Sequence, residues 1–181
     1  MKGSRLKQSQ LHKLFLQDLD GFTDHVQDTG RKPLKFHLKY PFNRDIKAYI
    51  FNCTGPPGGR SIDEWKIQLI LENQKRGERG GFDDSDGTTI LIVGYANVFD
   101  HDNGLWVLFE LDKHREFAYS ANIQIYLRQL LKAVDSGIFV HKKHNKETVV
   151  ISKRKHLKEA LEKRFDIDLQ VMLDKAEHGT T

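Results

Sequence analysis

Short runs in which apolar and polar residues alternate recur along most of the chain. The clearest follows Pro33, where residues 34–40 alternate strictly and predict a strand with one face toward a core. Its predicted core side is Leu34, Phe36, Leu38 and Tyr40, and its opposite side is Lys35, His37 and Lys39. Further strands are predicted at residues 46–53, 65–71, 89–96, 105–111, 121–126, 138–141 and 148–151, the last two forming a hairpin across residues 143–146.

Helical spacing of apolar residues appears in three places. It predicts a helix over residues 6–22 that ends near Gly21, and another over 127–135 that is stopped by Gly137. A third is predicted over 152–176, with Ser152 as its N-cap. Its apolar stripe would be Leu157, Leu161, Phe165, Leu169 and Leu173, and its opposite face Lys155, Lys158, Lys163 and Arg164.

These elements predict a mainly β, α+β fold in one domain of 181 residues. Seven or eight short strands separated by turn signals indicate an antiparallel barrel or pseudobarrel with flanking helices. Residues 1–30 would form a helix and lead-in, 33–151 the pseudobarrel and 152–176 the C-terminal helix. The longest predicted loop, residues 73–87, is glycine-rich, and loops of that length in compact domains are usually functional or mobile.

The net charge of +4 is unevenly distributed. Residues 1–60 carry +6, residues 61–120 carry −6 and residues 121–181 carry +4. Basic flanks are typical of a nucleic-acid binder, although ordinary solvated surface is an equally good explanation of charge alone. No apolar run approaches the ~20 residues of a membrane span. The single cysteine, Cys53, cannot form an internal disulfide, which favours a buried thiol and a cytoplasmic setting.

Catalytic motifs are weak in this sequence. Asp45, Glu64 and Lys66 have the spacing of a Mg²⁺-dependent nuclease, in which two carboxylates hold the metal and the lysine polarises water. In so charged a chain an acidic-x-Lys triplet also arises by chance, and Glu64 stands at the beginning of its strand and not within it. His141 and His144 have metal-ligand spacing, but a lysine-filled turn with one cysteine in the chain disfavours zinc. No phosphate-binding glycine loop is present, and we expect no cofactor and no catalysis.

Polar and basic side chains concentrate in three segments. The first holds Arg60, Lys66 and Gln68, the second Arg76 and Arg79, and the third runs from residue 113 to 124. Arginine and lysine neutralise phosphates, whereas hydroxyl and amide groups suit hydrogen bonds to phosphates or base edges. Candidates in the third segment are Lys113, Arg115, Tyr119, Ser120, Asn122 and Gln124. The alternative is that Phe117 and Tyr119 belong to the core and that Ser120 and Asn122 satisfy a turn.

The string from Pro56 to Gln68, which reads Pro-Pro-Gly-Gly-Arg-x-x-x-Glu-x-Lys-Ile-Gln, resembles one found in DNA-recognition domains of restriction endonucleases. These are the B3-like and SRA-like pseudobarrel modules of modification-dependent enzymes such as MspJI and AspBHI. Residues 91–95, the strand of Trp106 and residues 114–124 strengthen the resemblance, which spans about residues 33–165.

The resemblance implies a module that reads double-stranded DNA, with sequence or cytosine-methylation specificity, while a separate nuclease domain or subunit cleaves. One DNA-contacting arm would lie within residues 28–45 and another within 112–124, and Arg60 and Lys66 would contact the DNA backbone. The first arm adds the candidates Arg31, Lys35, His37 and Lys39.

Overall fold

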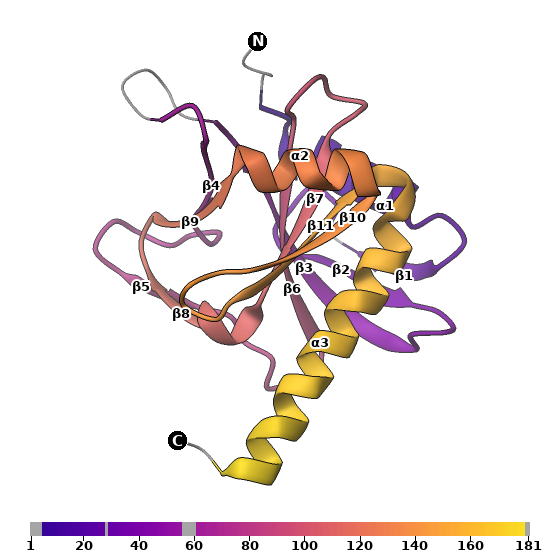
Figure 1. Ribbon diagram of the computed structural model, residues 1–181. Coiled ribbons are helices and arrows are strands. Elements are labelled where there is room, and N and C mark those ends of the chain that lie inside the picture. The colour runs from indigo at the N-terminus through magenta and orange to yellow at the C-terminus, as the bar shows by residue number, and fades with distance from the viewer. Residues whose placement is uncertain (1–4, 28, 56–60, 180–181) are drawn as a thin grey trace.

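The chain builds one large sheet that is covered on both faces (Figure 1). The computed structural model describes residues 5–27, 29–55 and 61–179. The sheet contains, in spatial order, β1 (Thr23–Gln27), β2 (Leu34–Leu38), β3 (Arg44–Cys53), β6 (Thr89–Ala96), β7 (Leu105–Phe109), β11 (Thr148–Lys153) and β10 (Ile138–Lys142). Neighbouring strands are antiparallel except β3 and β6. A parallel pair requires a long crossover, and here the described part of it, residues 61–88, packs on the second core at one face of the sheet.

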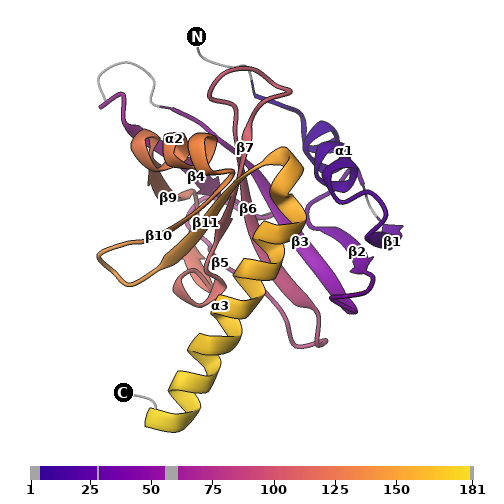
Figure 2. The same ribbon diagram turned by 45° about the vertical axis from the view of Figure 1, so that its right-hand side comes forward.

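Both faces of the central strands are apolar, because each carries a separate core. In β3, Ile46, Ala48 and Ile50 belong to the first core. The alternate residues Tyr49, Phe51 and Cys53 belong to the second. Two helices, α1 (Gln8–Asp18) and α3 (Leu157–His178), cover the first core (Figure 2). Strands buried on both sides read as nearly continuous hydrophobic runs, which is how residues 46–53 and 89–96 appear in the sequence.

The second core is covered by two short antiparallel pairs and a helix. β4 (Glu64–Leu69) pairs with β9 (Ala121–Tyr126), and β5 (Arg79–Gly81) pairs with β8 (Glu116–Ala118). The chain leaves β9 directly into α2 (Leu127–Ser136), which packs on β10 and β11. This layer carries most of the candidate side chains that lie together in the structure.

The prediction of a mainly β, mixed α+β chain is confirmed, and every strand predicted from the sequence is present. The sequence missed β1, β5 and β8, which are short and have at most one buried side chain each. The pseudobarrel is not confirmed: within the described residues the large sheet is open, with β1 and β10 as its edges.

Several predicted details are wrong. Tyr40 lies past the end of β2 and is 79 % exposed instead of facing the core. α3 begins at Leu157 after a 3₁₀ turn, Arg154–His156, so Ser152 lies buried in β11 and does not cap the helix. Arg164 is buried, where it bonds to Asp168 and to carbonyl oxygens of the sheet, and is not on a solvated face.

The C-terminal half of α3 extends beyond the edge of the sheet in both views (Figures 1 and 2). Leu169 and Leu173, predicted to continue the buried stripe, are therefore about half exposed. α2 matches its prediction and ends at Gly137. Cys53 is buried as predicted, and burial raises the pKa of its thiol to about 12. None of the helices in the described part of the chain is long and apolar enough to cross a membrane.

Candidate functional site

The pairing of β4 with β9 brings together two candidate segments that are far apart in the sequence. Lys66 lies opposite Gln124, and Gln68 lies opposite Asn122. The alternate residues of both strands are buried in the second core, so these side chains point away from it. We call the outward-facing set the polar ribbon: Glu64, Lys66, Gln68, Asn122, Gln124 and Tyr126.

Buried side chains on the inner face of β4 and β9 fix the polar ribbon on the second core. Ile67 is 0 % exposed and Ile125 is 1 % exposed. At Gly94 of β6, an added Cβ would lie 3.0 Å from the Ile67 side chain, so glycine permits this close approach. The ribbon is also joined to β3, since Thr54 and Lys66 exchange two backbone hydrogen bonds of 2.9 and 3.0 Å. A rigid backbone lowers the entropy cost of placing polar side chains against a ligand.

One end of the polar ribbon opens into a hollow of about 500 Å³. Its lining is Arg76, Gly77, Glu78, Arg79, Ala118, Tyr119 and Ser120. The pairing of β5 with β8 places Arg79 opposite Ala118 and so brings the second and third candidate segments together. Gln68 Nε2 donates a hydrogen bond of 3.1 Å to Ser120 Oγ, which joins the hollow to the ribbon.

Each of the two interpretations made from the sequence holds for part of residues 117–120, which run from β8 toward β9. Phe117 is buried and packs against Phe82, with ring centroids 5.0 Å apart, so it is a core residue. Tyr119 and Ser120 instead line the hollow. Ser120 has φ of 62°, a left-handed conformation that is uncommon outside glycine and costs about 1 kcal/mol or more. The surrounding structure therefore holds the Ser120 hydroxyl at the junction of hollow and ribbon.

The opposite end of the polar ribbon is basic, which the sequence analysis missed. The Arg128 guanidinium lies 4.3 Å from the Tyr126 ring centroid and also pairs with Asp63. Lys132 Nζ lies 5.0 Å from the Phe139 ring centroid. We call Arg128, Lys132 and Lys143 the basic end. The sequence does contain a signal for the basic end. Arg128 and Lys132 are one helical turn apart, and the other side of their helix is strongly apolar.

His141 lies close enough to these cations for their charges to affect its pKa. Burial lowers it, and the charges of Lys143, Lys132 and Arg128 lower it further. His141 therefore stays neutral at physiological pH beside three permanent cations. Two of these cations are in ion pairs, Arg128 with Asp63 and Lys143 with Glu147, and the charge of Glu147 partly offsets the effect of the cations on His141.

The first predicted arm lies apart from the polar ribbon. Lys35 and His37 lie on β2 near one edge of the large sheet, and His37 Nδ1 lies 2.9 Å from Asp45 Oδ1. Lys39 follows that strand and is exposed. Arg31 Nε lies 4.0 Å from Glu72 Oε1 and so reaches the loop that leads to Arg76. Glu72 does not line the hollow, so the structure does not bring these four predicted residues into it.

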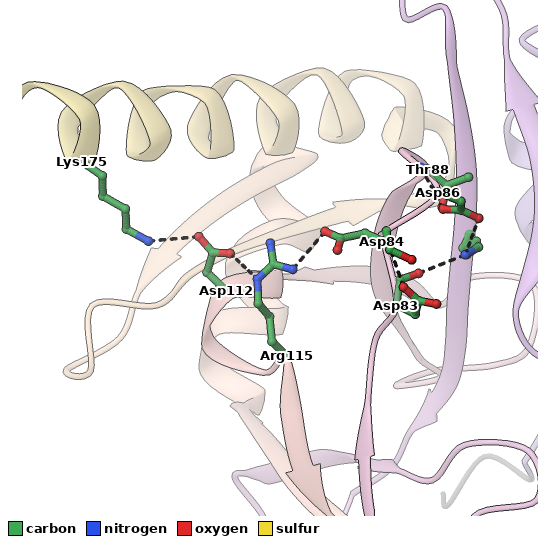
Figure 3. Close-up of polar contacts among 9 residues, drawn as sticks. Asp83, Asp84, Asp86, Thr88, Asp112, Arg115 and Lys175 are labelled. Carbon is green, nitrogen blue, oxygen red and sulfur yellow. Dashed lines mark hydrogen bonds and ion pairs between the residues drawn. The ribbon is translucent and has the colours of Figure 1, made fainter. Parts of the chain in front are cut away.

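Lys113 and Arg115 lie in an acidic region. Lys113 is exposed at the end of the 3₁₀ turn η1 (Leu111–Lys113). Arg115 bonds to Asp112 at 2.9 Å and to Asp84 at 3.0 Å, as Figure 3 shows. The hydrogen bond to Asp84, followed by that to Asp112, raises the pKa of Arg115. The Arg115 guanidinium is therefore already bound to carboxylates of the protein. Arg60 lies outside the described residues.

The three residues of the alternative magnesium site do not meet. Asp45 is at the start of β3, whereas Lys66 is bridged to Thr54, just past the other end of the same strand. Nine residue steps at about 3.3 Å each separate Asp45 from Thr54, or roughly 30 Å. Glu64 lies two residues from Lys66 in β4, so the two carboxylates, Asp45 and Glu64, are too far apart to hold one metal ion. Among the described residues, no group of three or more His, Cys, Asp or Glu side chains is placed to hold a metal ion.

The geometry can be compared with known proteins. Residues 44–161 match the model of the family described as methylase-associated X1, MTaX1. The match runs from the start of β3 into α3 and includes the polar ribbon, the hollow and the basic end. Among curated proteins and among solved structures, none matches this chain. Since the matched region covers well over half of the sequence, the chain belongs to the methylase-associated X1 family.

Proposed function

We propose that this chain recognises double-stranded DNA for a restriction–modification system. The observation that carries the proposal is the cross-strand pairing of Lys66 with Gln124 and of Gln68 with Asn122 on one outward surface. Glutamine and asparagine form bidentate hydrogen bonds with adenine, and lysine bonds to guanine. The family description, methylase-associated, supports a role beside an enzyme that modifies DNA.

The dimensions of the polar ribbon suit the major groove. That groove is about 12 Å wide and admits a two-stranded β-ribbon. From Ala121 to Tyr126 the strand rises by five steps of about 3.4 Å, roughly 17 Å. Since duplex DNA rises about 3.4 Å per base pair, this length matches about five base pairs. The ribbon would therefore read a short site.

Cations at both ends of the ribbon are placed for phosphate contacts. Arg76 and Arg79 are exposed at the hollow, and Arg128 and Lys132 are exposed at the basic end. Contacts to phosphates fix the register of a protein on the duplex, whereas contacts to bases carry the sequence information. In this proposal the two ends clamp the backbone while Gln68, Asn122 and Gln124 face the base edges.

Catalysis belongs to another domain or subunit in this proposal, either a nuclease or a methylase. The separation of Asp45 from Glu64 and Lys66 argues against the metal-dependent nuclease suggested by sequence spacing. A plasmid incubated with the protein and Mg²⁺ should be bound and remain intact. Cleavage that survives in the Lys66→Ala variant would point to a different catalytic site, and cleavage lost in that variant would restore the nuclease interpretation.

The test of base reading begins with selection of bound sequences from a random duplex pool, with and without cytosine methylation. The Asn122→Ala/Gln124→Ala variant should then lose discrimination between the selected and a random duplex by about 1 to 3 kcal/mol per bidentate contact. The matched control is Gln17→Ala, which removes an exposed amide from α1. Equal losses on selected and random duplexes, measured by fluorescence anisotropy, would refute base reading by the ribbon.

A further inference from the structure

The second half of α3 presents an apolar stripe that the rest of the chain does not cover. Leu157, Leu161 and Phe165 are buried against the first core. The stripe continues at helical spacing, but its next members are Leu169, 55 % exposed, Met172, 65 %, and Leu173, 48 %. Exposed apolar groups that extend a buried stripe mark an interaction surface more often than scattered single residues do.

A groove of about 320 Å³ lies beside this stripe, between α3 and the body of the protein. Its apolar lining includes Ile90, Leu111, Phe165, Leu169 and Met172. Its charged lining consists of Asp84, Glu110, Asp112, Asp166 and Asp168 together with Arg44 and Arg115. The groove lining therefore combines apolar side chains with five carboxylates and two guanidinium groups.

The two arginines that line the groove already have partners: Arg115 pairs with carboxylates of the groove, and Arg44 stacks on an aromatic ring. Arg115 lies between Asp84 and Asp112, and Lys175 Nζ donates to Asp112 at 3.1 Å (Figure 3). Burial opposes ionisation of Asp112, but the hydrogen bonds from Lys175 and Arg115 outweigh it and lower the pKa. Asp112 thus remains negative at neutral pH. The Arg44 guanidinium stacks on the Phe165 ring, 4.2 Å from its centroid.

We propose that this groove and stripe bind a basic amphipathic helix of a partner protein. Apolar residues at spacings of three and four are the anchors by which one helix packs along another, about 8 to 10 Å apart. Carboxylates outnumber cations both in the groove lining and along residues 166–178, and this negative balance favours lysine and arginine on the incoming helix. The groove lining contains none of the residues of the polar ribbon, so the partner would not compete with DNA for those side chains.

A second copy of the chain fits this surface poorly. Residues 166–178 carry Asp166, Asp168, Asp174 and Glu177 against Lys175 as the single lysine or arginine. Two such helices laid side by side would bring carboxylates together, which disfavours self-association. Charge complementarity therefore favours a basic segment of another protein.

The experiment uses the full chain and a fluorescent peptide with leucines at i, i+3, i+4 and i+7 and lysines elsewhere. The peptide should bind, and the Leu169→Ser/Met172→Ser/Leu173→Ser variant should bind at least roughly tenfold more weakly. The control Gln170→Ser/His178→Ser, on the same segment, should bind as the parent does. Thermal unfolding by circular dichroism checks that both variants fold.

Three results would overturn the proposal. The first is failure of the lysine peptide to bind the parent chain. The second is equal binding of a peptide in which glutamate replaces every lysine, because the excess of carboxylates would then have no role. The third is a concentration-dependent dimer in sedimentation that the Leu169→Ser/Met172→Ser/Leu173→Ser variant abolishes, because a second copy would then be the occupant.

Discussion

Removing the two arginines of the hollow should change how DNA binding depends on salt. Both Arg76 and Arg79 are exposed. The contact between Arg79 and Glu116 is 3.9 Å long, with side chains 68 % and 79 % exposed, and contributes little to stability because water screens it. The Arg76→Ala/Arg79→Ala variant should therefore fold normally. Any change in its DNA affinity then reports lost contacts and not lost structure.

The magnitude follows from counterion release. Each phosphate contact contributes about 0.9 to the slope of log K against log salt, so losing two should reduce the slope by about 1.8. Between about 50 and 200 mM salt, the variant should then lose roughly twelvefold less affinity than the parent. Fluorescence anisotropy titrations of one duplex at several salt concentrations measure this slope directly.

The control for that experiment is Lys155→Ala/Lys163→Ala, which removes the same charge from exposed positions on the far side of the sheet. It should leave the slope within error of the parent value. An unchanged slope in Arg76→Ala/Arg79→Ala would remove these arginines from the interface. An equal reduction in both variants would show that overall charge, and not the hollow, governs binding.

Three further predictions concern how the site is built. Ile67→Ala should destabilise the protein by about 2 to 5 kcal/mol in denaturant unfolding, because this fully buried side chain fixes the ribbon on the sheet; a loss under 1 kcal/mol would contradict that role. Gly80→Ala should disturb the hollow and weaken DNA binding, since the new Cβ would lie 2.8 Å from the Phe117 ring; unchanged affinity and unfolding would show that the ring moves freely. Glu147→Gln should cost about 3 to 5 kcal/mol at neutral pH, because buried Glu147 bonds to His114 at 2.7 Å; urea unfolding checks this.

The loss in Glu147→Gln should depend on pH in a fixed direction. Burial opposes ionisation of Glu147, but the hydrogen bond from His114 and the charge of Lys143 outweigh it and lower the pKa. A depressed carboxyl pKa stabilises the folded state above the unfolded pKa, and that stabilisation is lost as pH falls through the folded pKa. The difference between parent and variant should therefore shrink below about pH 4.3, the usual glutamate value. A constant difference across this range would contradict the ion pair.

The large sheet could be predicted from the sequence because its strands are strongly patterned. Residues 46–53 and 89–96 are nearly continuous apolar runs, and residues 34–38 alternate without exception. β1, β5 and β8 could not, because they have at most one buried side chain each and are held by pairing with other strands and not by a core pattern of their own. Nor does a pattern along one strand reveal its neighbours: the sequence indicated neither the parallel pairing of β3 with β6 nor that β1 and β10 would remain as edges of an open sheet.

The candidate site was predictable in composition but not in arrangement. Residue type identified Gln68, Asn122 and Gln124, but only the register of β4 against β9 places them on one surface. Arg115 has the same chemistry as Arg79 and directly precedes the strand that pairs with it, yet Asp84 and Asp112 occupy the Arg115 guanidinium. Side-chain type therefore selects candidates, whereas long-range strand pairing decides which of them lie together.

The most direct test of the central claim is whether the polar ribbon touches DNA. Cys53 is the only cysteine, and it is buried with its pKa raised to about 12, so a thiol-reactive photocrosslinker should label only an introduced cysteine. Gln124→Cys places the crosslinker on the ribbon, and Glu159→Cys places it at an exposed position of α3. With a selected duplex, light should crosslink DNA to the labelled Gln124→Cys protein and not to the labelled Glu159→Cys protein. Equal crosslinking at both positions, or crosslinking at Glu159→Cys alone, would contradict the account.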